Sequence, residues 1–238
     1  GLKPDAVVLV ATTKALKMHG GVKKEDLGSE NVDAVTSGCK NLERHIENIG
    51  KFGVPVIVAI NDYVTDTQKE HAAIIDYCKN IGVECKISSH WEKGGKGAAD
   101  LAEEVAKIAD SNSANFKTLY DNKLSLWDKT QYIAQNIYGA ANIIADKKIR
   151  NQFQKLEDDG FGEYPICMAK TQYSFSTDPL LMGAPSGHDV PIKEVRLSAG
   201  AEFVVVVCGE VMTMPGLPRI PASENIDVDD SGLIQGLF

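Results

Sequence analysis

The chain has 238 residues, of which 43% are hydrophobic, and this is enough for one large domain or two modest ones. Its formal net charge of −8 disfavours nucleic acid and anionic membranes as partners, because both attract a cationic surface. The five cysteines form no Cys-x-x-Cys pair, which indicates reduced thiols in a cytoplasmic protein and neither a disulfide framework nor a zinc site. No apolar run approaches the roughly 18 residues of a membrane-spanning helix, and no signal-peptide pattern is visible.

The first 112 residues alternate between predicted strands and helices. Strands are predicted over residues 6–12, 54–60 and 83–89, and the first two are apolar runs typical of strands buried on both faces. Helices are predicted over residues 41–52, 68–82 and 95–111. A capping box for the second helix can be made by Thr65 with Gln68 or by Thr67 with Glu70. This order predicts an α/β fold, with a parallel sheet built from βα units by right-handed crossovers.

After residue 112 the alternation stops. Helices are predicted over residues 124–140 and 146–161, and strands over residues 165–171 and 202–214. A segment rich in proline and glycine over residues 214–221 is interpreted as a rigid structural turn. We therefore divide the chain into an α/β part, residues 1–112, and a smaller α+β region, residues 113–238. Because the first residue is glycine and a core strand is predicted from residue 6, we expect the sequence to be a piece of a longer protein.

Two stretches have some of the parts of a phosphate-binding loop. A Walker loop requires Gly-x-x-x-x-Gly-Lys-Ser/Thr, so that backbone N–H groups surround the phosphates at a helix N-terminus. In residues 8–21, Lys14 and Lys17 precede the glycine pair, so the order is reversed. In residues 93–100, Gly97 stands where the magnesium-binding Ser or Thr is needed. The chain therefore carries no recognisable nucleotide-phosphate loop.

Polar and aromatic residues follow all three predicted strands of the first part. Ligands of open parallel sheets bind beyond the carboxyl ends of the strands, and the residues there are Thr12, Thr13, Lys14, Asn61, Asp62, Tyr63, His90, Trp91 and Lys93. Either Tyr63 or Trp91 alone is equally well explained as a cap on the sheet edge. Both rings at corresponding positions of consecutive loops favour a flat aromatic ligand held between them. Stacking of this kind contributes about 1–3 kcal/mol per ring.

Long blocks of the sequence carry a family resemblance. They are residues 10–21, 60–67, 90–98, 161–179 and 212–238, and they span essentially the whole chain. These blocks resemble the formate–tetrahydrofolate ligases, also called formyltetrahydrofolate synthetases. The sequence departs from the family pattern at Thr13 and Lys14, where a branched aliphatic residue and an arginine are usual, and at Tyr63, where phenylalanine is usual. Lys14 keeps the positive charge but loses the guanidinium fork, whereas Tyr63 keeps the ring.

The resemblance implies an enzyme of one-carbon metabolism that uses ATP with Mg2+ to phosphorylate formate and then transfers the formyl group to N10 of tetrahydrofolate. It implies that the folate stacks between Tyr63 and Trp91. The phosphate loop, the glycine-rich motif and the main catalytic basic residue of the family belong to an N-terminal portion that this sequence lacks. We therefore expect the chain to be the C-terminal part of the ligase, beginning midway through a P-loop-type large domain, and to be inactive alone. A monovalent cation is a further expected cofactor, and no metal ligand is expected in this chain.

The resemblance also suggests roles for cations near the sheet edge. Lys14 and Lys17 lie either near the anionic formyl phosphate or in an exposed turn. Lys93 and Lys96 precede a helix N-terminus in a glycine-rich loop, which suits the glutamate tail of the folate. Asn61 is a further candidate for substrate binding.

Three other residues near this edge are assigned structural roles. We expect Asp66 to cap a helix rather than to accept a hydrogen bond from the pterin. His19 and His90 are interpreted as turn or surface residues rather than proton carriers.

The alternative function is a non-catalytic module that binds folate or only mediates oligomerisation. The block around Cys167 has no histidine and acid pattern that would mark a nucleophile, so it is interpreted as a core strand with an oligomer or domain contact. A cytoplasmic homo-oligomer is the expected assembly, with tetrahydrofolate, formate and the N-terminal part of the same enzyme as partners.

Overall fold

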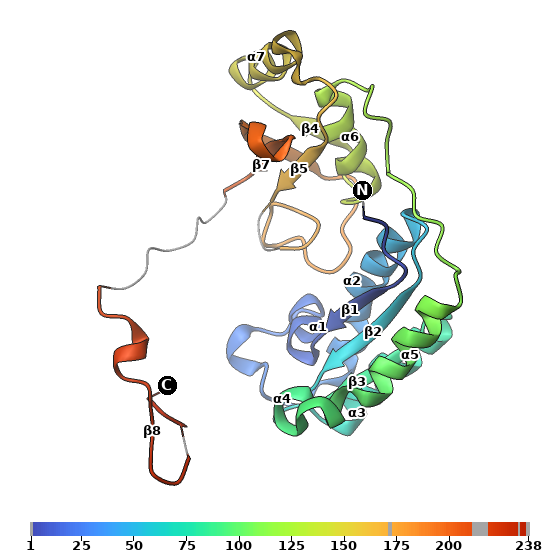
Figure 1. The fold of residues 1–238 in the computed structure, drawn as a ribbon, viewed down its shortest axis with the longest axis vertical. Coiled ribbons are helices and arrows are strands. Elements are labelled where there is room, and N and C mark those ends of the chain that lie inside the picture. The colour runs from blue at the N-terminus through green and yellow to red at the C-terminus, as the bar shows by residue number, and fades with distance from the viewer. Residues whose placement is uncertain (1, 171–172, 211–218, 233, 237–238) are drawn as a thin grey trace.

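The computed structural model describes residues 2–170, 173–210, 219–232 and 234–236 (Figure 1). Within these ranges the chain is a mixed α/β protein with two main sheets, each packed against helices of its own. A short hairpin of β8 (Asp227–Val228) and β9 (Ile234–Gln235) lies apart from both sheets in Figure 1.

The first sheet has three parallel strands, as the sequence predicts, and their order is β1-β2-β3. They are β1 (Val7–Ala11), β2 (Val56–Asn61) and β3 (Cys85–Ser88). The central strand β2 is buried on both faces, which confirms the prediction for its apolar run. The same prediction is wrong for β1, where Val8 and Val10 are exposed. Val8 and Val10 lie on the same face of the sheet, and their exposure shows that no described element covers this face at β1.

Five helices accompany this sheet: α1 (Thr13–His19), α2 (Val32–Lys51), α3 (Gln68–Asn80), α4 (His90–Lys93) and α5 (Ala99–Asp110). The capping box of α3 is made by Thr67 and Glu70, which resolves the two alternatives left by the sequence. The sequence predicts no helix directly after the first strand, but α1 begins there, and Thr12 caps it by accepting a hydrogen bond from the N–H of Ala15. Helix α2 also begins earlier than predicted, after the cap Asn31.

The second sheet is mixed, with the strand order β4-β6-β7-β5. Its elements are α6 (Leu126–Asn136), β4 (Asn142–Ile144), α7 (Lys147–Leu156), β5 (Ile166–Ala169), β6 (Asp189–Ser198) and β7 (Phe203–Cys208). Strands β4 and β6 pair in parallel, as do β5 and β7, while β6 and β7 are antiparallel. The sequence predicts neither β4 nor β6. The predicted strand over residues 202–214 ends at Cys208, and most of the predicted turn over residues 214–221 lies outside the described residues.

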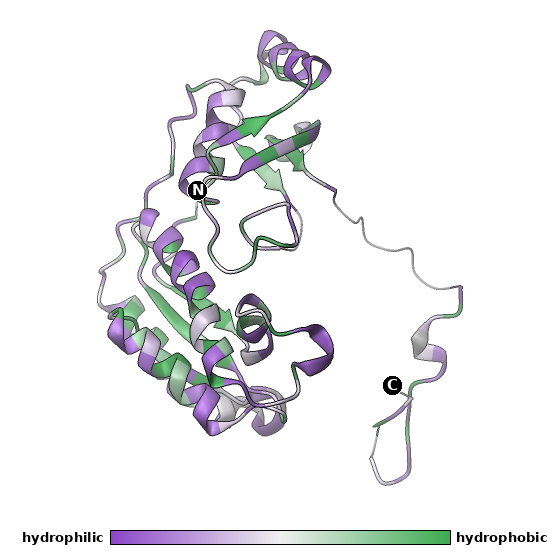
Figure 2. Cartoon of the chain, turned by 180° about the vertical axis from the view of Figure 1, so that it is seen from behind, coloured by the Kyte–Doolittle hydropathy of each residue, from purple (hydrophilic) through white to green (hydrophobic). Residues whose placement is uncertain are grey.

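Each sheet has a hydrophobic core of its own, and the apolar strands stand out in Figure 2. Helix α2 connects the two parts through its polar side chains. The amide of Asn41 donates to the carbonyl of Gly183 at 2.7 Å, and the amide of Asn48 donates to that of Ile137 at 2.8 Å. Within the described ranges, no helix has both the length and the apolar character that crossing a bilayer requires.

Candidate functional site

The carboxyl ends of the three parallel strands lie together at one edge of the first sheet. Strand β1 leads into α1, β2 leads into the loop of residues 62–67, and β3 leads into α4 (Figure 1). The backbone N–H of Asp62 donates to the carbonyl of Ser88 at 3.1 Å, so the second and third connections begin side by side. This edge therefore carries the residues that the sequence singles out as candidates.

Tyr63 and Trp91 are both exposed at this edge. Their relative accessibilities are 40% and 56%, so both ring systems can be reached from solvent. The indole Nε1 of Trp91 donates a hydrogen bond to the carbonyl oxygen of Asp62 at 2.8 Å. Because Asp62 directly precedes Tyr63, this bond fixes the indole against the loop that carries the second ring.

Lys14 and Asn61 lie beside Tyr63. The ammonium of Lys14 is 5.2 Å from the centroid of the Tyr63 ring, within the range of a cation–π interaction. The amide Nδ2 of Asn61 donates to the Tyr63 hydroxyl at 3.3 Å. The structure thus places two of the candidates, Lys14 and Asn61, against the side chain of a third.

Lys17 lies elsewhere, in the interior. Its ammonium is fully buried, 2.9 Å from the carboxylate of Glu70, and it donates to the carbonyl of Ser29 at 3.0 Å. The alternatives of a formyl phosphate contact or an exposed turn both require an accessible ammonium, so neither describes Lys17. The reason is helical geometry, because Leu16 and Lys17 face inwards on α1 while Lys14 stays at the edge.

Lys93 and Lys96 are exposed in the glycine-rich connection before α5, as expected. The ammonium of Lys93 lies 4.0 Å from the carboxylate of Glu92, a solvent-exposed pair of little energetic weight. The connection is closed by a hydrogen bond from the N–H of Ser89 to the carbonyl of Gly97 at 3.0 Å. Lys93 is the last residue of α4 and Lys96 lies in the 3-10 helix Gly94–Ala98, so both ammonium groups extend from helical turns that follow Trp91.

Asp66 is not the cap of α3, because Thr67 has that role. The Asp66 carboxylate instead accepts hydrogen bonds from the hydroxyl of Thr13 and from the backbone N–H of Tyr63, the latter at 3.1 Å. These bonds tie the start of α1 to the loop that carries Tyr63. The side chain of Asp66 is thereby committed to holding the site together.

The two histidines near this edge differ in their surroundings. His19 Nδ1 accepts from the N–H of Gly183 at 3.1 Å, and burial lowers the pKa of its imidazole. His19 therefore holds a loop of the second part against α1. His90 is exposed, and its Nδ1 lies 3.0 Å from the hydroxyl oxygen of Ser88.

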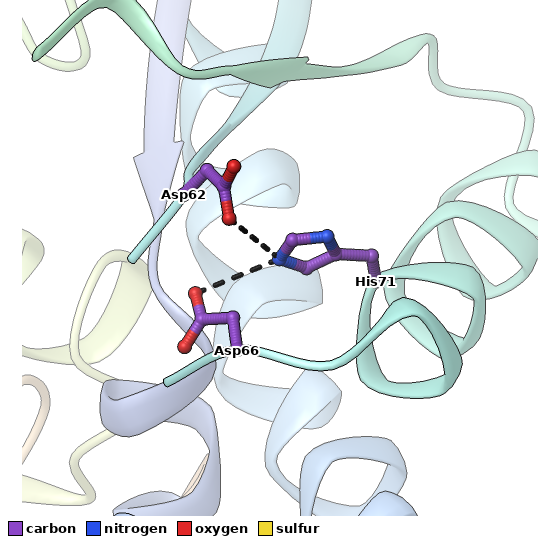
Figure 3. Close-up of side chains that lie close together, drawn as sticks. All are labelled: Asp62, Asp66 and His71. Atoms are coloured by element: carbon purple, nitrogen blue, oxygen red, sulfur yellow. Dashed lines mark ion pairs between the residues drawn. The ribbon is translucent and has the colours of Figure 1, made fainter. Parts of the chain in front are cut away.

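The sequence does not point to a cluster of Asp62, Asp66 and His71 below this loop (Figure 3). The Nε2 atom of His71 lies 3.6 Å from Asp62 Oδ1 and 3.5 Å from Asp66 Oδ2. The spacing of the three residues matches no common ligand motif, so only the fold reveals that they meet.

The comparison with known proteins identifies the family. All 238 residues match the family model described as "Formate--tetrahydrofolate ligase". The chain belongs to this family. The resemblance seen in the sequence blocks is thereby confirmed.

Relatives named formate–tetrahydrofolate ligase from Ruegeria pomeroyi and Roseobacter denitrificans are each 59% identical to the chain over its full 238 residues. A relative with the same name from Pelagibacter ubique is 55% identical over 237 residues. The chain covers 43% of the length of the first two and 42% of the third. It therefore spans well under half the length of these ligases.

Proposed function

We propose that the chain is part of an ATP-dependent formate–tetrahydrofolate ligase and supplies the surface on which tetrahydrofolate binds. The observation that carries this proposal is the pair of exposed rings, Tyr63 on the loop after β2 and Trp91 on α4 after β3, at the carboxyl edge of a parallel sheet. The pyrimidine ring of the reduced pterin is planar and conjugated, so it gains by stacking on such rings.

The polar neighbours of the two rings fit the rest of this ligand. Lys14 and Asn61 lie against Tyr63, where they are able to contact the anionic formyl phosphate or the polar edge of the pterin. Lys93 and Lys96 are exposed close to Trp91 in sequence, which suits the carboxylates of the glutamate tail. Lys17 has no part in this site because its ammonium is paired in the interior.

The nucleotide chemistry is assigned to the rest of the longer ligase. The 238 residues contain no Walker loop, so the binding of ATP with Mg2+ is assigned to sequence outside this chain, and the family resemblance assigns the catalytic residues there as well. A monovalent cation is a further proposed cofactor of the complete enzyme. In this proposal residues 1–112 complete a P-loop-type large domain and residues 113–238 form a smaller α+β region. Val8 and Val10 are exposed on the edge strand β1. This exposure supports the presence of a further structural element that packs on β1 and belongs to the remaining sequence of the ligase.

We further propose a cytoplasmic homo-oligomer for the complete enzyme. A second candidate function is a non-catalytic folate-binding module, favoured by the absence of a Walker loop from a chain that covers 43% of its relatives. The two candidates differ in whether formate-dependent ATP turnover appears when the rest of the ligase is present.

The test is tetrahydrofolate binding to the chain, measured by isothermal titration calorimetry. Replacing Trp91 with alanine removes one stacking face and is expected to weaken binding about 5- to 150-fold. The control is Trp127→Phe, on α6, where the ring packs edge-on against Phe153 at a centroid distance of 5.5 Å. Unchanged affinity in Trp91→Ala, with an intact circular dichroism spectrum, would mean that Trp91 only covers the sheet edge.

A further inference from the structure

The side chains of Asp62, Asp66 and His71 converge from two elements. The carboxylates come from the loop after β2, and the imidazole comes from the first turns of α3 (Figure 3). One donor atom from each residue lies within 4.8 Å of the other two. Both carboxylates face the same atom, Nε2 of His71, as the dashed lines of Figure 3 show.

The imidazole of His71 is buried without a hydrogen bond. Only 4% of its side chain is accessible, and among the residues that the structure describes neither ring nitrogen has a hydrogen-bond partner. A buried imidazole nitrogen that makes no hydrogen bond costs about 1–3 kcal/mol. A cation bound at Nε2 would supply the partner that this nitrogen lacks.

The distances around Nε2 fit a cation between the three residues. Zn2+ binds imidazole nitrogen and carboxylate oxygen at about 2.0–2.2 Å, and tetrahedral angles then place the donor atoms about 3.3–3.6 Å apart. The two measured separations from Nε2 are 3.6 Å and 3.5 Å. They are too long for good hydrogen bonds and match the span of one bound ion.

We propose that Asp62, Asp66 and His71 bind a divalent cation of the Zn2+ type, with water as the fourth ligand. One imidazole with two carboxylates is a donor set that suits Zn2+ better than Mg2+ or Ca2+, which prefer oxygen ligands alone. The carboxylate of Asp66 is oriented by the Thr13 hydroxyl and by the N–H of Tyr63, as ligating carboxylates usually are. Asp62 is 28% accessible through its side chain, which leaves a path for the ion and its water.

The cation would fix the conformation of the Tyr63 loop. Asp62 directly precedes Tyr63, Asp66 follows three residues later, and His71 belongs to the rigid helix α3. A bond from each to one ion closes the loop onto the helix beneath it. This site is distinct from the proposed folate surface, and its test does not depend on whether folate binds.

The test uses the chain after treatment with EDTA, with Cys167→Ser in every protein to remove the exposed thiol. Titration with Zn2+ is expected to show one equivalent bound per chain. Asp62→Asn and His71→Gln are each expected to weaken Zn2+ binding at least about 10-fold, because each removes a ligand. The matched control is Asp76→Asn, an exposed carboxylate on the same helix α3 that should leave binding unchanged.

Co2+ provides a second measurement that identifies the ligands. Tetrahedral coordination by nitrogen and oxygen gives visible d–d absorption, which is expected for the parent protein and lost in Asp62→Asn. Because Asp62 is partly accessible, this variant is expected to keep the circular dichroism spectrum of the parent. The proposal is overturned if no stoichiometric Zn2+ binding is found, if both variants bind as the parent does, or if the Co2+ spectrum shows thiolate charge transfer.

Discussion

The ammonium of Lys17 on α1 and the carboxylate of Glu70 on α3 form an ion pair of 2.9 Å in which both side chains are almost completely buried. Glu70 also accepts from the backbone N–H of Asn31 at 2.9 Å and from that of Thr67 at 3.1 Å. The pair therefore joins α1, the cap of α2 and the start of α3 at one point. These elements support Lys14, which lies on α1 itself, and the loop that carries Tyr63.

Replacing Lys17 with methionine is expected to lower the free energy of unfolding by about 3–5 kcal/mol, because Glu70 is then a buried charge without its cation. Urea denaturation followed by circular dichroism measures this change. The matched control is Lys69→Met, which removes a partner from the surface pair with Glu30 at 3.2 Å and should cost at most about 1 kcal/mol. Equal losses of unfolding free energy in Lys17→Met and Lys69→Met would contradict the burial of the pair of Lys17 and Glu70.

The pH dependence of the unfolding free energy should reveal the titration of the Glu70 carboxyl group. Burial raises the pKa of its carboxyl group, but the hydrogen bonds from the Asn31 N–H, Lys17 and the Thr67 N–H outweigh burial, so the pKa is lowered from 4.5. A lowered folded-state pKa stabilises the fold above the unfolded-state pKa, and this stabilisation is lost as the pH falls through the folded-state value. The difference in unfolding free energy between the parent and Glu70→Gln should therefore be constant above about pH 5 and shrink as the pH falls further. A difference that is independent of pH down to acid unfolding would contradict the prediction.

The first part of the fold was accessible to sequence reasoning because its signals are local. The apolar run of β2 and the capping box of Thr67 with Glu70 each specify an element within a few residues. The sequence does not predict helix α1, because the helix has only seven residues, two of them lysines and one a histidine, and its cap and first residue are both threonines, which are also common in turns. Its stability comes from packing on α2, which no local pattern reveals.

The candidate site was predictable only in part. Parallel topology brings Tyr63 and Trp91 to one edge, so the sequence is sufficient to expect both rings there. Lys17 points into the interior only because α1 is a helix. Asp62 and His71 lie close together because of the way the loop after β2 packs on α3, which the sequence does not reveal. Strands β4 and β6 were missed because the parallel pairing of Asn142 with Asp189 joins segments distant in the chain.

Helices α1 and α2 approach closely at Gly38, and this contact is testable. A Cβ on Gly38 would overlap the backbone carbonyl of Leu16, which cannot move without shifting α1. Gly38→Ala is therefore expected to destabilise the chain by about 1–3 kcal/mol, the usual cost of overpacking. Gly50→Ala, on the exposed side of the same helix with open space around its Cβ, should instead stabilise it by about 0.5–1 kcal/mol. Thermal unfolding of the two variants should shift the midpoint in opposite directions.

The contribution of the Tyr63 hydroxyl to tetrahydrofolate binding can be distinguished from that of its ring. Tyr63→Phe keeps the stacking face and loses only the 3.3 Å hydrogen bond from Asn61, so tetrahydrofolate binding should change little. Tyr63→Ala removes the face, as well as the ring beneath the Lys14 ammonium, and should weaken binding about 5- to 150-fold, as Trp91→Ala does. The losses in the double variant should not add, because both rings would contact one ligand.

In the complete ligase, the same alanine variants should raise the KM for tetrahydrofolate and leave the KM for ATP nearly unchanged, since the nucleotide is assigned to other sequence. Steady-state kinetics with each substrate varied in turn makes this measurement, and Tyr63→Phe is the matched control. If Tyr63→Phe impaired folate binding as severely as Tyr63→Ala, the hydroxyl and its contact with Asn61 would be the binding element rather than the ring. If the KM for ATP rose in parallel with that for folate, the edge formed by Tyr63 and Trp91 would support the whole active site instead of one substrate.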